Sequence, residues 1–187
     1  LMTTWKTGRR LVAERLTARA LPLDDFIAMV SSLRPARVPG TAVFMTAQPT
    51  GTPPALAHNV RYNKVLHDHV IVLTVSTAQQ PHVRAKDRLF VERLGQALFN
   101  VRVQYGFMDD PDVPSALEQA RQQGLELDAE DLAFFLGRET IIVTRRRGMA
   151  IWREKLFVLM ARNAVRATGF FRLPPERVVE LGVQVEL

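Results

Sequence analysis

The sequence predicts an α/β protein with a mixed β-sheet of about five or six strands, flanked by helices and preceded by a helical lead-in. Two short apolar, β-branched runs, residues 41–46 and 69–75, flank a helix-length segment that opens at Pro53-Pro54. Further along the chain, two alternating runs are separated by a turn, and another strand-like run follows near residue 187. Strands that alternate with helices favour a layered α/β fold.

Residues 1–37 are predicted to form a juxtamembrane lead-in of two helices, and residues 38–187 the α/β domain. Residues 5–20 carry a thin apolar stripe among many basic side chains, which is typical of a surface or juxtamembrane helix. In the second helix, Asp24 and Asp25 occupy the first turn, where the helix dipole favours acidic groups. Pro35 is expected to end it.

The remaining elements follow from turns and periodicity. Residues 77–86 are predicted as a loop, and residues 88–94 and 98–107 as an antiparallel hairpin. A helix is expected from residue 112 to about residue 123, because a proline lies near its start and Gly124 just past its end. Residues 132–136 and 140–144 are predicted as a short helix leading into a strand. Apolar spacing predicts a long helix over residues 149–170, and residues 178–187 are expected to form a strand.

Composition narrows the class of protein. The chain has 187 residues, a net charge of +6 and no cysteine, which excludes disulfides and thiolate metal sites. Its apolar runs fall far short of the roughly 20 residues that cross a bilayer. A basic surface attracts nucleic acid, nucleotides or anionic membranes, although an arginine bias alone also fits an ordinary surface. No helix-turn-helix or RNA-recognition pattern is present, so nucleic-acid binding is not expected.

One candidate ligand site lies around the first predicted strand-helix-strand unit. Thr46 and Gln48 lie where the first strand leads towards the helix, a position where backbone N–H groups can hold an anion. Asn59 and Asn63 lie four residues apart on that helix, with at least Asn63 expected to face the sheet. A structural role for the asparagines, as hydrogen-bond partners of the backbone, is equally consistent with the sequence. The loop lacks the glycine patterns of dinucleotide or P-loop sites.

Basic side chains form a second candidate. Arg9 and Arg10 in the lead-in, and the Arg145-Arg146-Arg147 cluster, are predicted to contact an anion or a membrane surface, unless they are simply solvated. His67 and His69 have a spacing that metals use, but no third ligand is evident. We therefore predict no metal site and no cofactor. Because no nucleophile elbow or paired carboxylates are found, no catalytic residue is assigned and the chain is not expected to be an enzyme.

Several motifs, taken in order along the chain, resemble the carboxyl-terminal cytoplasmic domain of the Kup/HAK/KT potassium transporters. They are Val38-Pro39-Gly40-Thr41-Ala42-Val43-Phe44, Pro53-Pro54-Ala55-Leu56, His58-Asn59, Asn63-Lys64-Val65-Leu66-His67, Tyr105-Gly106-Phe107-Met108, Phe135-Leu136-Gly137-Arg138-Glu139, Trp152-Arg153, Leu156-Phe157, Met160, Asn163-Ala164, Arg177-Val178-Val179-Glu180-Leu181-Gly182 and Gln184-Val185. The resemblance spans roughly residues 5–187.

The resemblance implies a soluble domain on the cytoplasmic side of the bacterial inner membrane, attached to the transmembrane part of a potassium/proton symporter. Its role would be assembly or regulation, without catalysis. Some relatives respond to cyclic di-AMP through such domains, which can dimerise. Partners implied are the transmembrane part, a second copy, the anionic membrane surface, and a cyclic dinucleotide or adenine nucleotide. Two alternatives stay open: a nucleotide-sensing module around Thr46, Asn59 and Asn63, and a free-standing basic nucleic-acid-binding domain.

Overall fold

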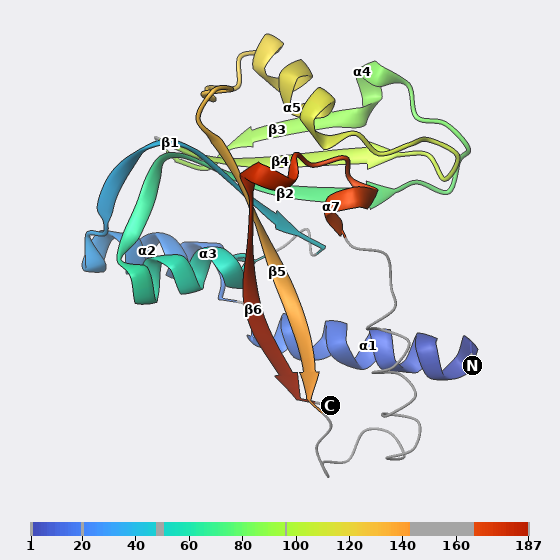
Figure 1. The fold of residues 1–187 in the computed structure, drawn as a ribbon, viewed down its shortest axis with the longest axis horizontal. Helices are drawn as coiled ribbons and strands as arrows, with labels where there is room; N and C mark the ends of the chain where they lie inside the picture. The colour runs from blue at the N-terminus through green and yellow to red at the C-terminus, as the bar shows by residue number, and fades with distance from the viewer. Residues whose placement is uncertain (1, 20, 48–50, 96, 143–166, 187) are drawn as a thin grey trace.

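A mixed six-stranded sheet with helices on both faces forms the centre of the structure, a computed structural model (Figure 1). The structure describes residues 2–19, 21–47, 51–95, 97–142 and 167–186. Its elements are α1 (Met2–Arg19), α2 (Leu23–Leu33), β1 (Ala36–Thr46), α3 (Pro54–His58), η1 (Asn59–Asn63, a π-helix), β2 (Val65–Thr77), α4 (Ala85–Arg88), β3 (Leu89–Arg93), β4 (Leu98–Tyr105), α5 (Val113–Gln122), β5 (Leu132–Ile142), α7 (Ala167–Phe170), η2 (Pro175–Arg177, a 3-10 helix) and β6 (Val178–Glu186).

The strand order β3-β4-β2-β1-β5-β6 is that of a doubly wound sheet with one antiparallel edge strand. β3 pairs antiparallel with β4, and every other neighbouring pair is parallel. Along the chain, the parallel strands run from β1 outward through β2 and β4, then return to the other side of β1 with β5 and β6. The order therefore reverses between β1 and β5. In open parallel sheets, the carboxyl ends of two such strands flank the usual ligand crevice.

Two apolar cores, one on each face, hold the sheet between helices. Val43, Leu73 and Phe134 pack on the face covered by α5, whereas Phe44, Val72 and Phe135 pack on the face covered by α2 and α3 (Figure 1). Neighbouring residues of one strand thus enter opposite cores, as the pleat requires. Burial on both faces explains why the central strands read as nearly continuous apolar runs.

The second lead-in helix belongs to the packed structure. Phe26 of α2 is only 2% exposed and lies in the core with Phe44 and Leu56. α2 ends at Leu33. The next residue, Arg34, adopts the left-handed conformation and donates its backbone N–H to the carbonyl of Val30, which caps the helix before Pro35. α1 contacts β6 and has no apolar face comparable to that of α2. The boundary between residues 37 and 38 stays a prediction.

The structure confirms most predicted elements and corrects two. The hairpin of β3 and β4, the helix α5 with Gly124 beyond its end, and the strand β6 are all confirmed. The prediction of a short helix before a strand at residues 132–144 is wrong, because Leu132–Ile142 is a single strand. Short apolar runs do not distinguish a helix from a strand buried on both faces. The single-turn helix α4 was predicted as part of a loop.

Residues 149–166 of the predicted long helix lie outside the described residues. At residues 167–170, the structure has the short helix α7. Within the described part of the chain, no helix combines the length and apolar character that crossing a membrane requires.

Candidate functional site at the carboxyl edge of the sheet

Thr46 lies at the point where the strand order reverses. It is the last residue of β1 and pairs with Thr74 of β2, on the opposite side from β5. The register of β1 with β5 stops one residue earlier, at Met45 and Leu136, and from there β5 continues alongside β6 alone. β1 and β5 therefore separate at the carboxyl end of β1. Gln48, the second predicted residue of this loop, lies outside the described residues.

Asn59 and Asn63 lie at the other end of the sheet. Asn59 is 6% exposed and donates from Nδ2 to the carbonyl oxygen of Val65, at the start of β2, at 3.0 Å. Val65 and Thr74 are nine positions apart on β2, which at about 3.3 Å per residue separates them by about 30 Å. The crevice predicted to contain Thr46 together with both asparagines is thus divided into two distant places.

The predicted anion-contact arginines are only partly described. Arg9 and Arg10 are exposed on α1, and Arg10 forms an ion pair with Glu14, one turn further along, at 3.6 Å. Because the side chains of Arg9 and Arg10 are exposed, both are accessible to a partner. Arg145, Arg146 and Arg147 lie outside the described residues, and their role as an anion or membrane contact stays a prediction.

An apolar pocket of about 140 Å³ lies between α2 and the sheet. Phe26, Ile27 and Val30 line it from the helix, and Val70 and Leu98 line it from the strands. Because its walls are mainly apolar, it suits a hydrocarbon group better than the phosphates of a nucleotide. Its lining includes Leu66 and Leu98, near the starts of β2 and β4, so the pocket lies away from the carboxyl edge of the sheet.

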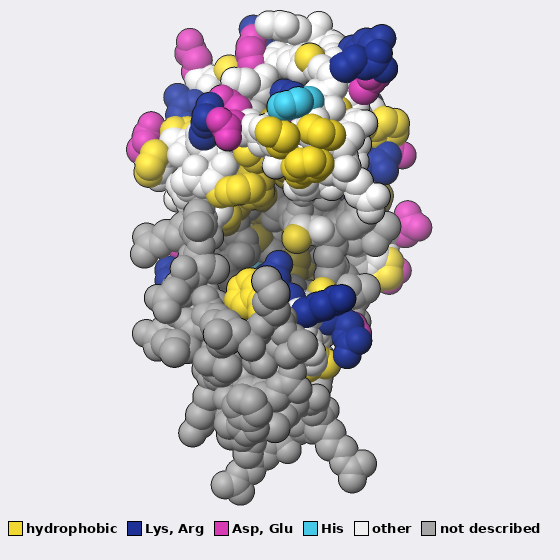
Figure 2. All heavy atoms as spheres, turned by 90° about the vertical axis from the view of Figure 1, so that its right-hand side faces the viewer, with side chains coloured by type: hydrophobic (Ala, Val, Ile, Leu, Met, Phe, Trp, Pro, Cys, Tyr) yellow, Lys and Arg dark blue, Asp and Glu magenta, His cyan; other side chains and the backbone are white. Residues whose placement is uncertain are grey.

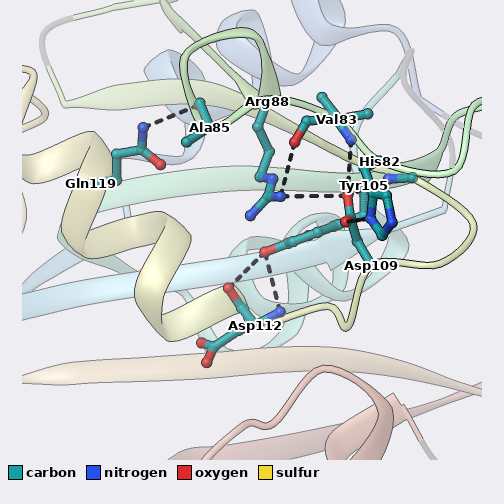
Figure 3. Close-up of polar contacts among 9 residues, drawn as sticks. His82, Val83, Ala85, Arg88, Tyr105, Asp109, Asp112 and Gln119 are labelled. Carbon is teal, nitrogen blue, oxygen red and sulfur yellow. Dashed lines mark hydrogen bonds and ion pairs between the residues drawn. The ribbon is translucent and has the colours of Figure 1, made fainter.

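The loops that follow β2 and β4 meet at the carboxyl edge around Asp109 (Figure 3; Figure 2 views the molecule from this side). The carboxylate accepts hydrogen bonds from His82 Nδ1 at 2.7 Å, the Gly106 N–H at 2.8 Å and the Val83 N–H at 3.0 Å. Arg88 Nη2 lies 3.4 Å from the same carboxylate. The His82 ring first, then the two backbone N–H groups, hold the pKa of Asp109 well below its ordinary value. The ionised carboxylate of Asp109 thus links the loop after β2 to the loop after β4.

Arg88 and Tyr105 extend this cluster towards α5 (Figure 3). Arg88 also donates to the carbonyl of Val83 at 3.0 Å, and its guanidinium lies 4.8 Å from the centre of the Tyr105 ring. The Tyr105 hydroxyl donates to the carbonyl of Asp112 at 2.6 Å, directly at the start of α5. The hydroxyl is protonated at neutral pH, and burial raises the pKa of Tyr105 further. The cluster fixes the geometry of this edge.

Comparison with known proteins identifies the family. The family described as the K+ potassium transporter C-terminal domain matches residues 39–187. The chain belongs to this potassium transporter C-terminal domain family. Its relatives include proteins named "Probable potassium transport system protein Kup" from Myxococcus xanthus and Azoarcus sp., each 51% identical over 187 residues, and "Kup 1" from Geobacter sulfurreducens, 49% identical over 188 residues.

These matches cover 100% of the chain but only 29% or 30% of each relative. The chain thus spans about three tenths of the length of the curated relatives that it matches. No solved structure matches it.

Within this member of the family, the cluster around Asp109 was missed by sequence reasoning. The Tyr105-Gly106-Phe107-Met108 motif next to Asp109 is part of the family resemblance. However, the partners of Asp109, His82 and Arg88, lie 27 and 21 residues before it and meet it only in the fold.

Among the described residues, no group of three or more His, Asp or Glu side chains could hold a metal ion. His67 and His69 each have a buried Nδ1 for which the described structure supplies no hydrogen-bond partner.

Proposed function

We propose that this chain is the cytoplasmic carboxyl-terminal domain of a potassium uptake transporter, and that it assembles or regulates the transporter without catalysis of its own. The observation that carries the proposal is the family match over residues 39–187, together with relatives at about 50% identity that are named as potassium transport proteins. As a carboxyl-terminal domain, the chain would follow the membrane helices of the transporter. The proposed location is the cytoplasmic side of the bacterial inner membrane.

The mechanism follows from linkage. A domain outside the membrane changes transport only by favouring one conformation of the membrane part over another. Arg9 and Arg10, exposed on α1, would lie near the anionic inner leaflet, as positively charged residues at the cytoplasmic ends of membrane helices do. A movement of the sheet would be transmitted to the lead-in helices, because α2 packs Phe26 into the same core as β1 and β2.

The test uses the full-length transporter in cells that lack their own potassium uptake. Potassium uptake is expected with the intact protein, and deletion of residues 1–187 of this chain is expected to lower the rate or raise the half-saturating potassium concentration. Membrane levels of both proteins must be matched by immunoblot. An intact protein that takes up no potassium, or a deletion that leaves both kinetic constants unchanged, contradicts the proposal.

A second candidate function is nucleotide sensing, favoured by the position of Thr46 at the reversal of strand order. An adenine nucleotide or a cyclic dinucleotide would bind there, with Gln48 as a further contact, whereas Asn59 and Asn63 lie too far away to share the same ligand. Titration calorimetry with cyclic di-AMP, ATP and AMP tests it. Heat that disappears in Thr46→Val is expected; absence of heat at millimolar nucleotide contradicts it. The same samples in sedimentation would show whether two copies associate.

A further inference from the structure

Three large apolar side chains are exposed at the carboxyl edge, close to the Asp109 cluster. Phe107 is 59% exposed, Met108 is 65% exposed, and Phe170 of α7 is 52% exposed. Figure 2 shows hydrophobic side chains gathered on this side of the molecule, next to a histidine. We call Phe107, Met108 and Phe170 the apolar edge patch. Exposed apolar groups that gather in this way mark interaction sites more often than single exposed residues do.

Two independent contacts tie the parts of the patch together. Arg172, two residues after Phe170, lies 3.2 Å from the carboxylate of Asp110, two residues after Met108. The N–H of Val113 also donates to the carbonyl of Phe171 at 3.3 Å. α7 is therefore attached to the loop that follows β4, although more than fifty residues separate them along the chain. The patch therefore draws on two segments that contact each other in the fold.

The loop that carries Phe107 and Met108 is rigidly held. The N–H of Phe107 donates to the carbonyl of Gln80 at 3.1 Å, and the N–H of Met108 donates to the carbonyl of Pro81 at 3.0 Å. Asp109 closes the turn by accepting the N–H of Gly106. Since the backbone is already ordered, a partner that covers these side chains has little loop entropy to overcome. Rigid, exposed aromatic and thioether side chains are typical anchors of protein interfaces.

The described ion pairs near the patch join arginines and aspartates of the domain itself. Arg84 lies 2.8 Å from Asp87, Arg172 contacts both Asp110 and Asp112, and Arg88 contacts Asp109. An anionic lipid surface attracts clusters of uncompensated basic residues. A rim in which arginines and aspartates alternate matches the polar rim of a protein interface instead. The charge pattern therefore favours a protein partner over a lipid surface.

We propose that the apolar edge patch docks the domain against the cytoplasmic surface of the membrane part of its own transporter, through apolar side chains of a cytoplasmic loop. This inference rests on the proposed function. The relatives are more than three times as long as this chain, and the matched domain is carboxyl-terminal, so the remaining polypeptide would join through α1. Figure 1 shows the amino-terminal end of α1 on the same side of the molecule as α7 and the loops after β2 and β4. The patch faces the side from which the membrane part would approach.

Photo-crosslinking in the full-length transporter tests the docking. Benzoylphenylalanine replaces Phe107, the transporter is irradiated in native membranes, and adducts are identified by mass spectrometry. We expect adducts between residue 107 and peptides of the membrane part. Phe90, a 49% exposed phenylalanine of the edge strand β3, is the matched control and should give no adduct with those peptides. The same replacement at Met108 repeats the measurement in case one variant fails to fold.

The possible results are distinct. Adducts of residues 107 and 108 with the membrane part, absent at residue 90, support the docking. Adducts with a second copy of this domain, adducts with lipid, equal adducts at residue 90, or no adduct at all overturn it. The uptake test of the proposed function is independent: if deletion leaves uptake unchanged while the adducts form, the regulatory role fails and the docking stands. If uptake depends on the domain but the adducts are missing, only the docking fails.

A measurement of potassium uptake complements the crosslinking experiment. Phe107→Ser with Met108→Ser changes exposed side chains that belong to neither apolar core, so the thermal unfolding of the domain should stay unchanged. Uptake by the full-length double variant is expected to shift towards that of the transporter without the domain. Uptake identical to that of the unchanged transporter, at equal membrane levels, would contradict a docking role for the patch.

Discussion

Asn63 donates a hydrogen bond from Nδ2 to Oδ1 of Asn59 at 2.9 Å, and Asn59 in turn donates to the carbonyl of Val65 at 3.0 Å. The relay runs from the π-helix η1 to the first residue of β2. It satisfies both ends of the buried Asn59 amide and fixes the point at which the helix turns into the strand. The left-handed Lys64 completes this turn. These contacts give both asparagines a structural task, and any ligand role for them stays a prediction.

Replacing Asn59 with alanine should therefore destabilise the domain. The side chain is 6% exposed, and its loss leaves the Val65 carbonyl without this donor, which typically costs about 1–3 kcal/mol. Asn63→Ala should cost less, since Asn63 is exposed, contrary to the expectation that it faces the sheet, and water can replace its hydrogen bond to Asn59. Urea unfolding of the purified chain followed by circular dichroism measures both. Equal stability of Asn59→Ala and the unchanged chain would contradict the structural role.

The sequence predicted the elements better than it predicted the site. Period-two alternation identified the β3–β4 hairpin, and the turn chemistry around Pro114 and Gly124 identified α5, because those signals are local. The strand order β3-β4-β2-β1-β5-β6 could not be read from local patterns, since it depends on which faces the crossover helices cover. Thr46 and Asn59 are separated for a different reason: β1 and β2 are parallel, so the end of β1 and the start of β2 lie at opposite ends of the sheet. The Asp109 cluster could not be read from local patterns either, because its partners come from another loop.

Phe26→Ala should unfold the sheet and not only the lead-in helix. Phe26 is 2% exposed in a core shared with β1, β2 and β5, and truncation of a buried phenylalanine typically costs about 3–5 kcal/mol. Ile27→Ala, at a position 40% exposed on the same helix, should cost far less. Hydrogen exchange of the β1 and β2 amides locates the effect. If only α2 amides lose protection, the lead-in is an independent unit and this prediction is wrong.

His67 should make the domain less stable in mild acid. Burial lowers its pKa from the ordinary 6.5, opposed by the carboxylates of Asp131 and Asp68. The unfolded chain therefore binds the proton first as the pH falls, so stability is full above about pH 6.5 and decreases below it towards the folded-state pKa. His67→Gln should flatten this part of the curve. Unfolding at pH 5 to 8 measures it, with exposed His58→Gln as control.

Asp109→Asn should weaken the carboxyl edge in a way that depends on pH. The folded-state pKa of Asp109 lies well below the ordinary 3.8, so the stability from its ionised form is present above about pH 4 and lost as the pH falls through the folded value. The asparagine variant should be less stable at pH 7, and the difference should shrink in strong acid. A gap that does not change with pH would show that the charge of Asp109 contributes nothing.

Gly106→Ala tests how closely the two loops of this edge approach. A Cβ at Gly106 would overlap the carbonyl of Pro81 and come within 2.6 Å of the His82 Cα, so the backbone itself would have to move. Overpacking of this kind typically costs about 1–3 kcal/mol. Gly95→Ala is the matched control, because its nearest neighbour would be Leu98 Cβ at 3.9 Å, an ordinary contact. Thermal unfolding compares them, and equal midpoints would mean that the loops do not meet at Gly106.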